Sequence, residues 1–186
     1  NEKDNIDIVF SGSITPNKGQ EHLIKALGYI EKDILKKIHI DFIRNIGSKY
    51  YKELIKLIEK MKVEKNISFL GYRNNLRENL SSYDIGVICS KSEGFGRVTA
   101  EYMAAELCVI ASDTGANTEL IENEKNGLIY NYNNDKELAE KIKKIYNNKK
   151  LIDIYGKNAR DTIIEKFTKE INADNIKKIY LRGKRG

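Results

Sequence analysis

The sequence predicts a three-layer α/β domain built on a parallel sheet of about six strands. Short apolar runs alternate along the 186 residues with longer stretches whose apolar residues recur at helical spacing. This alternation is typical of β-α-β units, in which helices cover both faces of a parallel sheet. A chain of this length, 40% hydrophobic with a single proline, can bury one core but not two. We therefore expect one domain over residues 1–186.

The strand candidates are short runs rich in β-branched residues, as strands buried on both faces require. They are Ile6–Ser11, Ile38–Ile43, Ile67–Leu70, Ile85–Cys89, Val109–Ser112 and Gly127–Ile129. Open parallel sheets bind ligands at the carboxyl ends of their strands. Functional residues are therefore expected in the loops that follow the strands.

Helices are expected between the strands and after the last one. Two apolar stripes at helical spacing precede the third strand, namely Leu23, Ile24, Leu27 and Ile30, and Leu54, Ile55, Ile58 and Met61. Two closing helices are indicated by Leu138, Ile142 and Ile145, and by Ile154, Ala159, Ile163 and Phe167. A further helix is expected from about Glu170 to Leu181.

The net charge of +6 raises the question of an anionic partner. Between residues 135 and 150 lysines interleave with acidic residues, as on a solvated helix face. No aromatic-studded basic strand is present, which argues against nucleic acid. No stretch approaches the roughly 20 apolar residues of a membrane-spanning helix. We expect a cytoplasmic protein, with peripheral association at the inner face of the membrane as an alternative because lysines attract anionic lipid.

The cysteines and histidines do not form a metal-binding pattern. Cys89 and Cys108 fall inside apolar runs, where a thiol behaves as a small buried hydrophobe, and His22 and His39 are isolated. Neither a structural zinc site nor a disulfide framework can be assembled from them. We expect no metal and no cofactor.

The loop after the first strand, residues 11–19, leads into a helix. Gly12 allows backbone amides to approach a ligand closely, and Lys18 adds a full charge near the positive end of the helix dipole. These features favour a phosphate site. A turn with a solvated lysine explains the same residues, so both interpretations stay open here.

The loop after the fourth strand is the most informative, and residues 90–105 read SKSEGFGRVTAEYMAA. Gly94 and Gly96 permit a tight turn that presents consecutive N–H groups. A helix beginning near Arg97 points its free amides at the same place. The sequence therefore predicts an anion site made mostly of backbone.

Two carboxylates bracket this turn with seven residues between them. Glu93 lies in the loop and Glu101 about one turn into the helix. A pair that holds hydroxyl groups at two ends of an elongated ligand fits this geometry better than acid and base work on one bond. The spacing alone also fits two ordinary surface glutamates.

The loop after the fifth strand spans residues 113–119. Its short polar residues are expected to cap the helix that follows, and its glycine, Gly115, to lie close to a ligand.

Together these segments resemble the retaining glycosyltransferases of family 4, whose donor-binding half carries two glutamates separated by seven residues within a segment like Glu-Gly-Phe-Gly. Glu93 and Glu101 match that pattern. The resemblance extends from the 12–19 loop through Gly71 and Tyr72 to the turn at residues 126–127. It implies a Rossmann-like domain that is the C-terminal half of a two-domain GT-B enzyme, whose N-terminal acceptor-binding domain is absent from this chain.

The resemblance also implies a site for a nucleoside-diphosphate sugar, with UDP as the default nucleotide. Lys18 would pair with the diphosphate and Glu93 would reach the sugar hydroxyls, which makes these two the candidate catalytic residues. Glu101 would bind the ribose hydroxyls, and Arg44 and Tyr72 would line the base pocket. The other candidate donor-binding residues are Gly12, Ser13, Gly94, Phe95, Gly96, Arg97, Val98 and Thr99.

The implied reaction is retaining transfer of a hexosyl-type sugar to a saccharide, lipid-linked or cell-envelope acceptor. The isolated domain is expected to bind the donor without transferring sugar. Ser13 departs from the family pattern, which usually has a basic residue there, and Arg97 or Arg44 would have to supply the missing charge. Glu106 and Cys108 stand where the family tends to have glycine and proline.

Two other functions remain open. An epimerase acting on nucleotide sugars would use the same sheet edge, but the spacing of Glu93 and Glu101 argues against it. A non-catalytic subunit that binds nucleotide sugars would explain Ser13.

Overall fold

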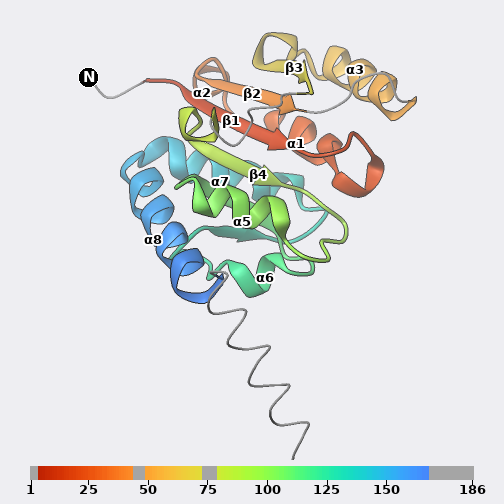
Figure 1. The fold of residues 1–186 in the computed structure, drawn as a ribbon. Helices are drawn as coiled ribbons and strands as arrows, with labels where there is room; N and C mark the ends of the chain where they lie inside the picture. The colour runs from red at the N-terminus through yellow and green to blue at the C-terminus, as the bar shows by residue number, and fades with distance from the viewer. Residues whose placement is uncertain (1–3, 44–48, 73–78, 168–186) are drawn as a thin grey trace, which may run out of the picture.

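The computed structural model describes residues 4–43, 49–72 and 79–167. A six-stranded sheet in the order β3-β2-β1-β4-β5-β6, parallel throughout, forms its centre (Figure 1). Its strands are β1 (Ile6–Ser11), β2 (Ile38–Ile43), β3 (Ile67–Gly71), β4 (Ile85–Ile88), β5 (Cys108–Ser112) and β6 (Leu128–Tyr130). The predicted strands are confirmed, with ends that differ by at most one residue. Arg44 and the helix expected at 170–181 lie outside the described residues.

Helices cover both faces of the sheet, so the predicted three layers are confirmed (Figure 1). Their bounds are α1 (Gln20–Leu27), α2 (Lys32–Leu35), α3 (Lys49–Met61), α5 (Arg97–Ala104), α6 (Asn117–Leu120), α7 (Asp135–Asn147) and α8 (Lys150–Phe167). Short 3-10 turns are η1 (Pro16–Lys18), η2 (Glu64–Asn66) and η3 (Leu80–Ser82). The two apolar stripes and the two closing helices correspond to α1, α3, α7 and α8, although Ile30 lies beyond the end of α1.

The core is divided into two clusters by the sheet. Leu23, Leu54 and Ile142 bring α1, α3 and α7 onto one face, and Met103 and Ala159 bring α5 and α8 onto the other. Strands β4 and β5 are fully buried. The expectation that every strand is buried on both faces is wrong for β3, which is only partly buried along its length because it is an edge strand.

Replacing Phe42 by alanine should cost about 3–5 kcal/mol of unfolding free energy, as expected for a fully buried aromatic ring. Phe42 is 1% exposed, and its ring packs against Phe10 at 5.4 Å and Phe69 at 5.1 Å between centroids. Denaturant titration followed by circular dichroism measures the loss. Tyr29→Ala, at a side chain 53% exposed, is the control and should cost far less. Equal losses would contradict this assignment of the core.

The strand order creates a switch point between β1 and β4. The chain runs outward from β1 through β2 to β3, and then returns to place β4 on the other side of β1. The loops after β1 and β4 therefore diverge to opposite faces, and in open α/β sheets ligands bind at such a point, in the crevice at the carboxyl ends of the strands.

Candidate active site at the carboxyl edge of the sheet

The loops after β1 and β4 are joined directly at the switch point. The backbone N–H of Lys91 donates to the carbonyl of Asn17 at 2.8 Å. Gly19, with φ of 70°, packs so closely that a Cβ there would lie 2.3 Å from the carbonyl oxygen of Cys89. Only glycine fits both the left-handed backbone and this contact. The β1 loop is therefore held against the end of β4.

Lys18 and Glu93, the two candidate catalytic residues, meet across this junction. Lys18 Nζ lies 2.8 Å from Glu93 Oε2, and the two side chains are 26% and 10% exposed. The hydroxyl of Ser90 donates to the same oxygen at 3.1 Å. Lys18 is therefore not a solvated lysine in a turn, and Glu93 is not an ordinary surface glutamate. Sequence reasoning missed Ser90, although its position directly after an apolar run was a usable signal.

The loop after β5 fixes the backbone of Glu93. The N–H of Ala116 donates to the Glu93 carbonyl at 2.9 Å. Gly115 has φ of 52°, and a Cβ there would lie 2.1 Å from the same carbonyl oxygen. Gly115 is thus packed against the Glu93 loop, and its closeness to a ligand stays a prediction.

The expectation that polar residues of this loop cap α6 is wrong. Ala116 occupies the N-cap position, with no side-chain hydrogen bond to the helix. The hydroxyls of Thr114 and Ser112 instead donate to the carbonyl of Ser90, at 2.7 and 2.9 Å. These polar groups join the β4 and β5 loops because buried carbonyls need partners.

Helix α5 points its N-terminus at the same crevice. Gly96 is its N-cap residue with φ of 58°, and the helix begins at Arg97, as predicted. The first-turn amides of an α-helix have no acceptors within the helix, so those of Arg97, Val98 and Thr99 suit an anion. The buried Thr99 hydroxyl donates to Asn117 Oδ1 at 2.7 Å. The Thr99 side chain is therefore bonded to α6, and only its backbone N–H stays a predicted ligand contact.

A buried tyrosine anchors α5 to the end of β1. Tyr102 OH donates to Ser11 Oγ at 2.9 Å and accepts from the Ser11 N–H at 2.6 Å. Burial raises the pKa of Tyr102 well above its usual range, so the phenol stays protonated. Gly86 makes room for the ring, since a Cβ there would lie 2.3 Å from Tyr102 Cδ2. Neither Tyr102 nor Gly86 was found from sequence.

A partly buried pair of side chains supports the β1 loop at the start of α1. His22 Nδ1 lies 2.7 Å from Asp135 Oδ1, which joins the start of α1 to the start of α7. The His22 backbone N–H donates to the Gly19 carbonyl at 2.9 Å. Gln20, also in the first turn of α1, donates through Nε2 to the Ser13 carbonyl at 2.9 Å. The backbone that carries Lys18 is thereby fixed before any ligand arrives.

Four other sequence-predicted residues lie in the β1 loop, in α5 and directly after β3. Gly12 has φ of 148° and is buried, while Ser13 is exposed. Glu101 lies one turn into α5, as predicted, and is half-buried. Tyr72 follows β3 and is 63% exposed, so the fold places it at the same edge of the sheet.

The loop between Glu93 and α5 is open to solvent. Gly94 has free space around its Cα, and the Phe95 side chain is 91% exposed. Gly94, unlike Gly96, does not adopt a left-handed backbone. The backbone conformation of the turn therefore requires glycine at position 96 but not at position 94.

Both cysteines are expected to be inert toward thiol reagents in the folded protein. Cys89 and Cys108 are fully buried, and burial raises the pKa of the Cys89 thiol to about 12. Absorbance after addition of a disulfide reagent at pH 8 should show no released thiol until denaturant is added, when both react. Rapid release from the native protein would contradict the burial.

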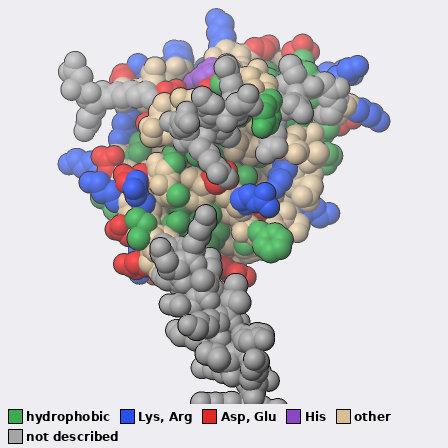
Figure 2. All heavy atoms as spheres, viewed as in Figure 1, with side chains coloured by type: hydrophobic (Ala, Val, Ile, Leu, Met, Phe, Trp, Pro, Cys, Tyr) green, Lys and Arg blue, Asp and Glu red, His purple; other side chains and the backbone are tan. Residues whose placement is uncertain are grey.

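Charge on the face shown in Figure 2 is mixed. On the face shown in Figure 2, Lys and Arg side chains alternate with Asp and Glu around the outline. Within residues 4–43, 49–72 and 79–167, no group of three or more His, Cys, Asp or Glu side chains could hold a metal ion. No helix in this part of the chain is both long and apolar enough to cross a membrane.

A switch-point crevice with a lysine-bearing loop on one side and a helix N-terminus on the other defines the nucleotide-binding class of open α/β domains. Residues 1–162 match the family model described as glycosyl transferases group 1. The chain belongs to this family, and its Rossmann-like fold matches structures of GT-B glycosyltransferases.

Individual relatives of the chain are also glycosyltransferases. The chain is 31% identical over 174 residues to the uncharacterized glycosyltransferase MJ1178 of Methanocaldococcus jannaschii, covering 92% of this chain and 47% of that one. It is 30% identical over 159 residues to poly(ribitol-phosphate) alpha-N-acetylglucosaminyltransferase of Staphylococcus aureus, covering 84% and 31%. The chain thus spans half or less of the length of these relatives.

Solved structures superpose over nearly the whole chain. The structure of Anabaena Alr3699/HepE in complex with UDP matches with a TM-score of 0.87 and 25% identity, over 95% of this chain and 49% of that one. The same protein in complex with UDP-glucose matches with a TM-score of 0.85.

Proposed function

We propose that this chain is the donor-binding half of a retaining glycosyltransferase and that its ligand is a nucleoside-diphosphate sugar, most simply a UDP-sugar. The observation that carries the proposal is the ion pair between Lys18 and Glu93 at 2.8 Å, which lies at the switch point beside the N-terminus of α5. The HepE complexes with UDP and UDP-glucose support the choice of nucleotide.

The geometry suggests how the donor would be held. A lysine ammonium has three donors, so Lys18 can bind a phosphate oxygen while it keeps its contact with Glu93. Lys18 and the amides of Arg97 and Val98 would stabilise the charge that develops on the diphosphate as the bond to the sugar breaks. Both described contacts of the Glu93 carboxylate involve Oε2, which leaves Oε1 to accept a sugar hydroxyl.

Glu101 and Tyr72 extend this site toward the nucleoside. Glu101, one turn further along α5 than the phosphate-binding amides, would accept hydroxyl groups of the ribose. The exposed ring of Tyr72 would contact the base. The acceptor would be held by an N-terminal domain, as the length of the relatives suggests. Retention, the hexosyl sugar, the independence of metal, a cytoplasmic location and association with the membrane surface all stay predictions.

Calorimetric titration of the chain with UDP, GDP, ADP and TDP tests the proposal. We expect selective binding of one nucleotide, weakened by Glu101→Ala, and no sugar transfer by this chain alone. Lack of any binding at millimolar nucleotide would contradict a donor site in this chain. Transfer to an acceptor by the chain alone would refute the need for a second domain.

The exposed Ser13 keeps a non-catalytic, nucleotide-sugar-binding subunit as a second candidate, because no basic side chain stands at this position. The longer protein separates the two functions. If Glu93→Ala abolishes sugar transfer while nucleotide binding persists, the protein is catalytic. Unchanged activity or phenotype would favour the non-catalytic subunit.

A further inference from the structure

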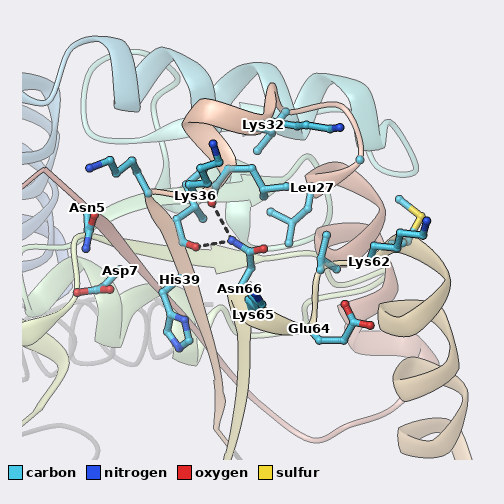
Figure 3. A pocket seen from close by; sticks show the side chains of 17 residues that line it. Asn5, Asp7, Leu27, Lys32, Lys36, His39, Lys62, Glu64, Lys65 and Asn66 are labelled. Carbon is cyan, nitrogen blue, oxygen red and sulfur yellow. Dashed lines mark hydrogen bonds between the residues drawn. The ribbon is translucent and has the colours of Figure 1, made fainter.

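A hollow lies at the amino edge of the sheet (Figure 3), the edge opposite to that of Lys18 and Glu93. It has a volume of about 980 Å³ and is bounded by the end of α1, by α2 and by the end of α3. Pockets of several hundred ångströms cubed are the size that small-molecule sites occupy. The donor crevice does not explain this feature, because the two lie at different ends of the strands.

The wall of this hollow is partly apolar, and its accessible apolar side chains are the half-buried Leu35 and Met61. Leu27, Ile38 and Val63 line it and belong to the buried core. Met61 forms part of the wall, and its methyl carbon occupies the space that a side chain at position 28 would take, since a Cβ on Gly28 would lie 2.4 Å from Met61 Cε. Gly28 has an ordinary backbone, with φ of −68°. Glycine is therefore required at this position by the packing of Met61 and not by a turn.

A buried amide holds the back of the hollow in shape. Asn66 Nδ2 donates to the carbonyls of Leu35 at 2.7 Å and Ile38 at 2.9 Å, shown as dashed lines in Figure 3. These two bonds join η2 to α2 and β2. The hollow is therefore formed by a fixed framework and not only by surface side chains.

The rim of the hollow is basic. It carries five lysines and two carboxylates, namely Lys32, Lys36, Lys37, Lys62, Lys65, Asp7 and Glu64. Lys36 and Lys37 pair with the exposed Asp33 and Asp4. In the part of the chain that the structure describes, Lys32, Lys62 and Lys65 form no ion pair. Three cations thus remain available to a ligand, namely Lys32 from α2, Lys62 directly after α3 and Lys65 from η2 (Figure 3).

The backbone fixes Lys62 at this rim. Its φ is 59°, and the bonds from Val63 N to the Ile58 carbonyl and from Lys62 N to the Glu59 carbonyl form a Schellman motif that ends α3. This position favours glycine, yet it carries a lysine. The backbone that carries the charged Lys62 side chain is therefore fixed beside the hollow.

We propose that this hollow is a second binding site, for a small anionic ligand with an apolar body, such as an aromatic phosphate ester. The lysines would bind the anionic group, and the surface formed by Leu35 and Met61 would bind the apolar body. Occupancy is independent of the donor nucleotide, because the two sites share no residue and lie at opposite edges of the sheet.

Backbone amide NMR during titration with phenyl phosphate tests the proposal, with inorganic phosphate and phenol as probes of each half of the ligand. We expect shifts at residues 61–66 that persist in millimolar UDP, and affinity for phenyl phosphate at least fivefold above that for either half. The double variant Lys62→Glu and Lys65→Glu should bind phenyl phosphate at least tenfold more weakly. Lys52→Glu, a single charge reversal on α3 away from the hollow, is the control.

Gly28→Ala provides a variant without a change of charge. Its Cβ would push the flexible end of Met61 out of place, so phenyl phosphate should bind more weakly while the spectrum stays that of a folded protein. Shifts confined to the loops at residues 12–19 and 90–99, or equal affinity of the double variant and Lys52→Glu, would overturn the proposal. Binding of UDP is measured separately in each variant, so failure of the donor site would not be mistaken for failure of this one.

Discussion

Lys18→Ala is expected to lower sugar transfer by the intact protein by about 10²–10³-fold, the usual effect of removing one group that stabilises charge in the transition state. Lys18 is the basic side chain that lies 2.8 Å from Glu93 at the junction of the β1 and β4 loops. With Ser13 in place of the usual basic residue, no described side chain of the β1 loop can replace it. The effect should therefore be larger than in a site with two cations.

The effect of Lys18→Ala on nucleotide affinity can be measured on this chain alone. Calorimetry should show a loss of at least tenfold in affinity for UDP upon Lys18→Ala, with uridine affected little because it carries no phosphate. Lys91→Ala removes an exposed lysine from the neighbouring loop and is the matched control. Equal losses for UDP and uridine would indicate a general collapse of the loop instead of a lost phosphate contact. Unchanged UDP affinity would refute the role assigned to Lys18.

Local sequence pattern predicted the sheet well because each strand is a short apolar run between polar loops. Burial on both faces demands such runs, and β4 and β5 meet that demand fully. The edge strand β3, which is only partly buried at every residue, is less buried than expected. The short helix α2 was not predicted, because four residues cannot show a helical period.

The candidate site was predicted as far as its residues share one loop or one motif. Glu93, Gly96 and Arg97 lie close together in sequence, and the structure confirms the turn and the helix that follows. The contacts that hold them, in contrast, join residues far apart in sequence. Tyr102 bonds to Ser11 across 91 positions, and Lys18 to Glu93 across 75. Such pairs follow from the strand order, which no local pattern reveals.

Short polar residues showed a further limit of the sequence. Thr114 and Asn117 are typical of helix caps, so capping was the natural expectation. The structure instead uses their side chains to satisfy carbonyls of Ser90 and Ser112. Buried carbonyls in neighbouring loops need hydrogen-bond donors, and this need outweighed the local preference for a helix cap.

The second large effect is expected from Gly115→Ala, which should destabilise the protein by about 3 kcal/mol or more. Alanine at φ of 52° carries the strain of the left-handed region. Its Cβ would also lie 2.1 Å from the carbonyl oxygen of Glu93, and a backbone atom cannot turn aside as a flexible side chain can. The loop after β5 or the Glu93 loop must therefore move, which would also disturb the hydrogen bond from Ala116 to Glu93.

Gly94→Ala is the matched control, because it changes a glycine only one residue beyond Glu93. Nothing lies within 4 Å of a Cβ at Gly94, and its backbone is not left-handed. Its free energy of unfolding should change by no more than about 0.5 kcal/mol. Denaturant titration and UDP calorimetry on both variants measure the difference. If Gly115→Ala keeps both stability and UDP affinity, the contact between the two loops does not position Glu93. If Gly94→Ala loses UDP affinity at unchanged stability, the turn itself must be free of a side chain to admit the donor.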